Sequence, residues 1–63
     1  MNYPELIRIY REKKFLTQED LARLLGVSTV TVNRWENGKF EPTMKMKRKL
    51  FNLFVSAKMN VED

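Results

Sequence analysis

The chain contains no cysteine and no histidine. Without cysteine there is no disulfide to stabilise a small fold and no thiolate to bind zinc. Without histidine there is no usual general base and no imidazole ligand for a transition metal. We therefore expect no metal, no cofactor and no enzyme active site. At 63 residues, the fold must rest on one small apolar core, because so short a chain buries only roughly 60% of its surface.

Glycine and proline are scarce, with two of each, and no flexible linker or internal repeat divides the chain. No apolar run approaches the ~18 residues that a membrane span needs. Residues 1–5 lack the basic start and apolar stretch of a signal peptide. We therefore expect a single domain over residues 1–63 and a cytoplasmic location.

Positive charge is in excess, since twelve Lys and Arg oppose eight Asp and Glu, for a formal net charge of +4. A basic surface favours polyanions such as DNA, RNA or anionic lipid. Many small proteins are basic for solubility alone, however, so the placement of the charges has to decide between these interpretations.

A first helix is predicted to begin near Pro4, because the first turn of a helix does not need the N–H that proline lacks. Apolar residues then recur at helical spacing up to about Lys14. A second helix is predicted after Thr17, whose hydroxyl can cap it and whose capping-box partner is approximated by Asp20. Gly26 should end this helix.

The third predicted helix is the least obvious, because the β-branched stretch 29–32 alternates like a strand. Helix is favoured because Ser28 is a good N-cap, because Val32 and Trp35 lie three apart, and because no strand partner is in view. Asn37 and Gly38 should end this helix.

Thr43 is predicted to cap a fourth helix after Pro42. Its first half is crowded with cations, which is unfavourable at a helix N-terminus unless an anion lies nearby. Residues 61–63 are expected to fray. The apolar stripe of this helix is Met46, Leu50, Leu53, Phe54 and Ala57.

The second and third helices, joined by Gly26-Val27, form the pattern of a helix-turn-helix. The segments LTQEDLA (16–22), LGVS (25–28) and VNRWENG (32–38), followed by Pro42, resemble the Cro/repressor-type (Xre-like) helix-turn-helix family. The resemblance runs from about residue 7 to residue 54. It implies an all-α, lambda-repressor-like fold: a compact four- to five-helix bundle with the helix-turn-helix at about 17–36. It also implies a bacterial or phage-type transcriptional regulator that binds double-stranded DNA as a homodimer.

Val32 and Trp35 should anchor the third helix to the core and leave its opposite face free for the major groove. The residues predicted to contact bases on that face are Thr29, Val30, Asn33 and Arg34. The alternatives are a solvated surface or phosphate contact for Arg34, a backbone contact for Asn33 and a solvent-facing helix start for the other two.

Phosphate contacts are assigned mainly through the resemblance, which places Gln18 at the clamped N-terminus of the second helix and puts Asn37 and Lys39 in the loop after the third. The full set of predicted phosphate-contacting residues is Gln18, Ser28, Thr31, Asn37, Lys39 and Arg11. Ser28 could instead only cap its helix, and Thr31 could face the second helix. Lys45, Lys47 and Arg48 either extend this strip or form a solvated helix face. The resemblance also implies a partly buried ion pair between Arg11 and Glu36.

The chain departs from the family pattern at Phe15, where glycine is usual, and at Lys47 and Arg48, where apolar residues are usual. The first turn is therefore expected to pack differently. The fourth helix is either rotated, or these cations run along the edge of the core. The apolar residues in excess of a small core are predicted to contact a second subunit or another domain; they are Phe51, Phe54, Val55 and Met59.

Three other function classes stay open. The first is a protein-interaction or antitoxin-like module with weak or no DNA binding, which an acidic third helix would favour. The second is an enzyme, which a bundle with so little concavity makes the weakest hypothesis. The third is a membrane-surface peptide, since the fourth helix is basic and amphipathic.

Overall fold

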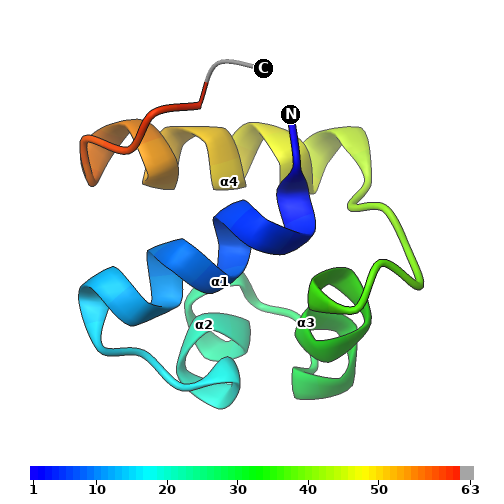
Figure 1. Ribbon diagram of the computed structural model, residues 1–63. Coiled ribbons are helices and arrows are strands. Elements are labelled where there is room, and N and C mark those ends of the chain that lie inside the picture. The colour runs from blue at the N-terminus through cyan, green and yellow to red at the C-terminus, as the bar shows by residue number, and fades with distance from the viewer. Residues whose placement is uncertain (62–63) are drawn as a thin grey trace.

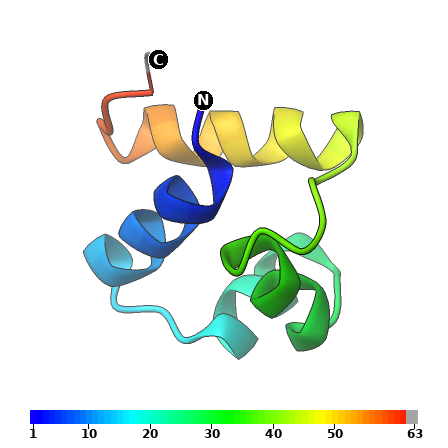
Figure 2. The same ribbon diagram turned by 45° about the vertical axis from the view of Figure 1, so that its right-hand side comes forward.

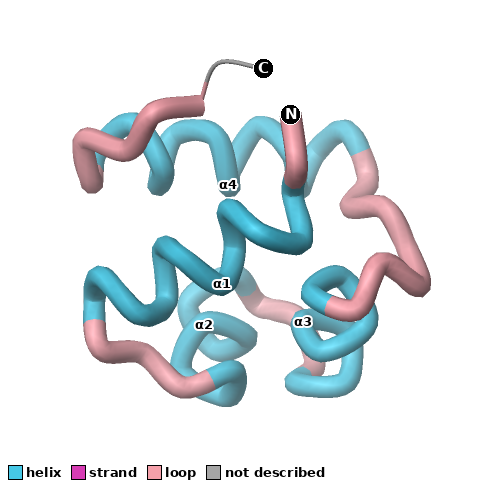
Figure 3. The backbone as a smooth tube through the Cα atoms, in the orientation of Figure 1, coloured by secondary structure: helices cyan, strands magenta, loops and turns pink. Residues whose placement is uncertain are grey.

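A computed structural model describes residues 1–61, which form four helices and no strand (Figure 3). They are α1 (Tyr3–Lys14), α2 (Gln18–Leu25), α3 (Thr29–Glu36) and α4 (Met44–Ser56). The predicted all-α class is confirmed, including helix rather than strand over residues 29–32. Of the segment expected to fray, residues 62–63 lie outside the described range. Val61 belongs to no helix and is half-buried against the core.

The helices stack in an order that leaves α2 and α3 at one end of the molecule (Figures 1 and 2). Helix α4 lies across the opposite end, next to the N-terminus, and α1 lies between α4 and the α2–α3 pair. Helix α1 packs against both α3 and α4, and α2 packs against α3. The outer side of α3 is therefore turned away from α4.

Local hydrogen bonds cap the second, third and fourth helices at the predicted residues. Thr17 Oγ1 accepts a bond from the Asp20 N–H at 3.0 Å, and Asp20 Oδ2 accepts one from the Thr17 N–H at 2.9 Å. This reciprocal pair is the predicted capping box. The hydrogen bonds from Thr17 hold the pKa of Asp20 below its usual value. Ser28 and Thr43 cap α3 and α4 by a single bond each, in which the side-chain oxygen accepts from the backbone N–H of Thr31 and of Met46.

The ends of α1 and α2 both have a left-handed backbone. Gly26 ends α2 with φ 75°, as predicted. Phe15 ends α1 with φ 58° and ψ 42°, which is the conformation that glycine adopts without strain. The Phe15 and Leu16 N–H groups donate to the carbonyls of Glu12 and Arg11, so the helix end is hydrogen-bonded although the residue is not glycine.

The core lies where the helical stripes meet. Phe54 is completely buried and its ring lies 6.3 Å from Tyr3 and 6.1 Å from Tyr10. The prediction that Phe54 contacts a partner was therefore wrong, because its side chain is completely covered by other residues of the core. Met59 is half-buried against that core, while Phe51 and Val55 remain 40% and 51% exposed. The fully or nearly fully buried apolar side chains are Ile7, Tyr10, Leu21, Ala22, Leu25, Val32, Trp35, Leu50, Phe54 and Ala57.

The two unusual cations of α4 behave differently. Lys47 is half-buried, with its ammonium 5.4 Å from the centre of the Tyr3 ring, whereas Arg48 is exposed. Helix α4 thus keeps its predicted apolar stripe, and Lys47 runs along the edge of the core. Within residues 1–61 no helix is long and apolar enough to cross a membrane. The same range contains no group of three or more His, Cys, Asp or Glu side chains that could hold a metal ion.

Candidate nucleic-acid interface

Helix α3 has two distinct faces. Val32 and Trp35 are buried, as predicted, and fix one face on the core. The other face is exposed and carries the four predicted base-contacting residues, which recur at helical spacing: Thr29, Val30, Asn33 and Arg34. This surface offers hydroxyl, amide, methyl and guanidinium groups. The stretch 28–34 contains no acidic residue, so no carboxylate in it would repel a polyanion.

The start of α3 is held by two hydroxyl side chains. Ser28 Oγ accepts a bond from the Thr31 N–H at 3.1 Å and lies 2.9 Å from Thr31 Oγ1. Ser28 is exposed and Thr31 is half-buried. Ser28 therefore caps the helix, and its side chain lies beside the exposed face of α3.

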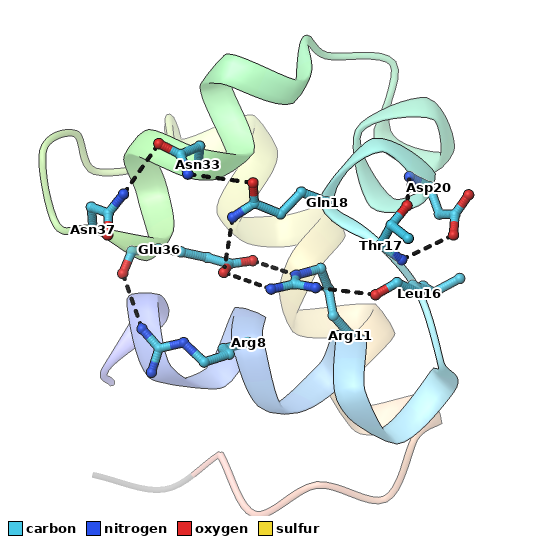
Figure 4. Close-up of polar contacts among 9 residues, drawn as sticks. All are labelled: Arg8, Arg11, Leu16, Thr17, Gln18, Asp20, Asn33, Glu36 and Asn37. Carbon is cyan, nitrogen blue, oxygen red and sulfur yellow. Dashed lines mark hydrogen bonds and ion pairs between the residues drawn. The ribbon is translucent and has the colours of Figure 1, made fainter.

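Glu36, at the end of α3, is buried at the centre of a network of polar contacts (Figure 4). Its carboxylate accepts hydrogen bonds from Nε and Nη2 of Arg11, the latter at 2.9 Å. A third donor of Arg11, Nη1, bonds the Leu16 carbonyl at 3.1 Å. The exposed fractions of the two side chains are only 18% for Arg11 and 5% for Glu36. The implied ion pair is therefore present, and it ties α3 to α1.

The charges of this pair stabilise each other. Burial raises the pKa of the Glu36 carboxyl, but hydrogen bonds from Arg11 and Gln18, with the nearby positive charges, lower it by more. The net pKa of Glu36 is below its usual value. The hydrogen bond to Glu36 raises the pKa of Arg11. Both groups are consequently ionised at neutral pH.

A chain of side-chain amides leads from Glu36 to the surface (Figure 4). Gln18 Nε2 donates to Glu36 Oε1 at 3.2 Å, and Gln18 Oε1 accepts from Asn33 Nδ2 at 3.3 Å. Asn33 Oδ1 in turn accepts from Asn37 Nδ2 at 3.1 Å. Three predicted contact residues from α2, α3 and the following loop are thus brought together, and each orients the next.

The loop after α3 folds back along the helix. Gly38 has φ 70° and donates its N–H to the Trp35 carbonyl, and the Lys39 N–H donates to the Arg34 carbonyl at 2.9 Å. The Lys39 side chain is exposed. The same loop places the guanidinium of Arg34 over the Phe40 ring, 5.1 Å from its centre.

Sequence reasoning assigned no role to two residues of this region. Arg8 donates to the Glu36 carbonyl at 3.3 Å, at the C-terminal end of α3. A basic residue is favourable at the C-terminal end of a helix. No pattern of neighbouring residues in the sequence, however, indicates that Arg8 of α1 lies close to that carbonyl. For Phe40 the sequence offers one indication, since it is an aromatic residue directly after the Gly38-Lys39 turn.

The cations of α4 are only partly available. Lys45 and Arg48 are exposed, whereas Lys47 lies 3.8 Å from a carboxylate oxygen of Glu41. The anion expected near this helix start is thus supplied in part by the chain itself.

Comparison with known proteins gives consistent matches. A family model described as helix-turn-helix matches residues 7–54. An uncharacterized HTH-type transcriptional regulator of Methanocaldococcus jannaschii is 44% identical over 48 residues, which cover 76% of this chain and 73% of that protein. The HTH-type transcriptional regulator DicA of Escherichia coli is 42% identical over 55 residues, 87% of this chain and 36% of DicA. The HTH-type transcriptional activator BcrR of Enterococcus faecalis is 33% identical over the whole chain, which spans 32% of BcrR. No solved structure matches significantly.

Proposed function

Because this chain belongs to the helix-turn-helix family of DNA-binding transcriptional regulators, we propose that it reads duplex DNA in a sequence-specific way by inserting α3 into the major groove. The exposed, acid-free face of α3 supports the proposal most directly. The major groove is about 12 Å wide, admits a helix, and shows a different set of donors, acceptors and methyl groups for each base pair. The activity is binding rather than catalysis.

Arg34 is the first base-reading residue. Its guanidinium can donate two bonds to O6 and N7 of guanine. Asn33 can pair with adenine, because the bonds to Gln18 and Asn37 still leave its amide one N–H and one lone pair. Thr29 and Val30, which are both exposed, supply methyl groups to thymine.

Phosphate contacts fix the register of α3 on the duplex. They come from the exposed Lys39 and Asn37, from Gln18 at the N-terminus of α2, and from Ser28 and Thr31 at the start of α3. Lys45 and Arg48 extend this strip. Arg11, which the sequence predicts as a phosphate contact, is instead bonded to Glu36 and Leu16 through three of its donors. We assign it the role of holding α3 in place.

The functional unit in this proposal is one DNA-binding domain, acting in the cytoplasm as a homodimer on a two-fold-symmetric site. The two α3 helices then lie about one DNA turn apart, roughly 34–36 Å. Phe51 and Val55, exposed one turn apart on α4, are the proposed contact with the second copy. DicA and BcrR are much longer than the region that matches this chain. A further domain is therefore the alternative partner for the exposed side chains of Phe51 and Val55.

Selection of bound sequences from a randomised duplex pool tests the proposal. A palindromic consensus would report both the site and the dimer. Affinity for the selected duplex should fall steeply as salt rises, because neutralised phosphates release their counterions. Absence of duplex binding even at low salt would contradict the proposal and leave the protein-interaction module as the better hypothesis.

A further inference from the structure

Phe40 is half-exposed beside the proposed DNA face, where a large apolar side chain gains little by burial. Its exposed fraction is 51%. The guanidinium of Arg34 lies over its ring, 5.1 Å from the ring centre. Within residues 1–61 Arg34 forms no hydrogen bond or ion pair with any other side chain. The Phe40 ring is therefore the specific partner of the Arg34 guanidinium within the described residues, and Phe40 also lines a hollow with Tyr3, Pro4 and Pro42.

The backbone of the loop fixes this pairing. Gly38 takes a left-handed conformation that turns the chain back, and the Lys39 N–H is bonded to the carbonyl of Arg34 itself. Pro42, two residues after Phe40, is buried. Phe40 is consequently held between two anchored points of the loop, with the guanidinium of Arg34 over its ring.

We propose that Phe40 is a positioning residue for base recognition, which holds the guanidinium of Arg34 in the orientation that reads guanine. This inference rests on the proposed function. An arginine side chain gives up much rotational freedom when it is fixed at a base. A cation–π contact with Phe40 restricts Arg34 before DNA arrives, and it leaves the N–H groups at the edge of the guanidinium free.

Removal of the Phe40 ring should change DNA binding in a specific way. The contact does not change the charge of Arg34 and does not touch a phosphate. Loss of the ring should therefore lower affinity only for sequences that carry the guanine, and should leave the dependence of affinity on salt unchanged. A residue that merely shaped the loop would also displace Lys39, and its loss would reduce the salt dependence.

The test compares variants on the duplex that the wild-type protein selects from a randomised pool, and on the same duplex with its guanines replaced one at a time. Phe40→Leu keeps an apolar side chain but removes the ring, and Phe40→Tyr keeps the ring. Phe15→Leu is the matched control, since Phe15 is 93% exposed at the end of α1. Arg34→Ala, alone and combined with Phe40→Leu, closes a double-mutant cycle. Thermal unfolding confirms that each variant is folded.

Phe40→Leu should weaken binding to the selected duplex roughly two- to fivefold, the value of an exposed cation–π contact. The preference for the guanine that Arg34 reads should fall by the same factor, with no change of the salt dependence. Phe40→Tyr and Phe15→Leu should bind like wild type, and Phe40→Leu should have no effect in the Arg34→Ala background. In the free protein, the Arg34 side-chain protons should show an upfield ring-current shift that Phe40→Leu abolishes.

Two results are distinguishable as failures. If the wild-type protein selects a guanine-containing site but Phe40→Leu keeps the full preference, or weakens binding equally in the Arg34→Ala background, this inference is overturned and the proposed function stands. If the wild-type protein selects no sequence and binds no duplex, the proposed function is overturned and the inference with it.

Discussion

Arg11 on α1 and Glu36 on α3 are joined by two hydrogen bonds although they lie 25 residues apart in the sequence. Glu36 is also bonded to Gln18 of α2, so one carboxylate connects three helices. The same carboxylate lies one amide away from Asn33, a proposed base contact. The stability of the fold and the geometry of the proposed reading surface therefore depend on a common group.

Replacement of Glu36 by Gln should destabilise the fold by about 3 kcal/mol. Removing one partner of a buried pair costs about 3–5 kcal/mol, and the lower end applies because the Arg11 side chain is 18% exposed and can partly reach water. Urea denaturation measures the loss. Glu19→Gln is the control, since the Glu19–Arg23 pair is exposed on both sides and should contribute less than about 1 kcal/mol. Equal losses for the two variants would contradict the role given to Glu36.

Acid should destabilise the protein through the same carboxylate. Hydrogen bonding lowers the pKa of Glu36 in the folded state below its ordinary value of 4.5, and that of Asp20 below 3.8. A carboxyl whose folded pKa is depressed stabilises the fold above its unfolded pKa, and this contribution is lost as pH falls through the folded pKa. With no histidine in the chain, stability should be level between about pH 7 and pH 5 and fall below about pH 4.5.

Unfolding in urea at a series of pH values measures this curve. In Glu36→Gln the acid-induced loss should be clearly smaller, because the buried carboxyl that titrates is gone and, within residues 1–61, the carboxyl whose pKa is still lowered is Asp20 of the capping box. If the stability of that variant fell at low pH as much as that of the wild type, other carboxylates would control the acid sensitivity.

The helices and their caps could be predicted because the signals are local. Thr17 and Asp20 lie three residues apart, so their reciprocal bonds follow from sequence spacing alone. The surplus of apolar residues on α4 was harder to interpret. Helical periodicity places Phe54 in the apolar stripe, but the spacing does not show how far that stripe is covered, and the rings of Tyr3 and Tyr10 are what bury Phe54 in the core.

The candidate site divides in the same way. Its exposed face follows from the positions of Val32 and Trp35, which bury the opposite side of α3. The bond from Arg8 to the Glu36 carbonyl spans 28 residues, and the contact of Phe40 with Arg34 depends on how the loop turns at Gly38. Neither contact follows from the spacing of residues along a helix.

Phe15→Gly should stabilise the protein. A residue with a Cβ in the left-handed conformation costs roughly 1–2 kcal/mol, and the greater freedom of glycine in the unfolded chain takes back about 0.5–1 kcal/mol. The ring is 93% exposed, so little packing is lost. We expect a net gain of about 0.5–1 kcal/mol, or a rise in Tm of a few degrees. Phe15→Ala, which keeps the Cβ, should show no such gain, and a loss of stability in Phe15→Gly would contradict the strain.

Lys39→Ala and Arg34→Ala should weaken DNA binding in different ways. The exposed Lys39 is assigned to a phosphate, so its loss should lower affinity about equally for all sequences and reduce the slope of log affinity against log salt by about 1. Arg34 is assigned to a guanine, so its loss should remove about 1–3 kcal/mol of discrimination at one base position. Titrations of selected and unrelated duplexes at several salt concentrations separate the two effects.

Lys58→Ala, on the exposed segment after α4, is the control for a lost surface charge and should change neither quantity. The assignment is reversed if Lys39→Ala changes the preferred base while Arg34→Ala changes only the salt slope, because a guanidinium bonded to a base edge carries sequence information that a phosphate-bound ammonium does not.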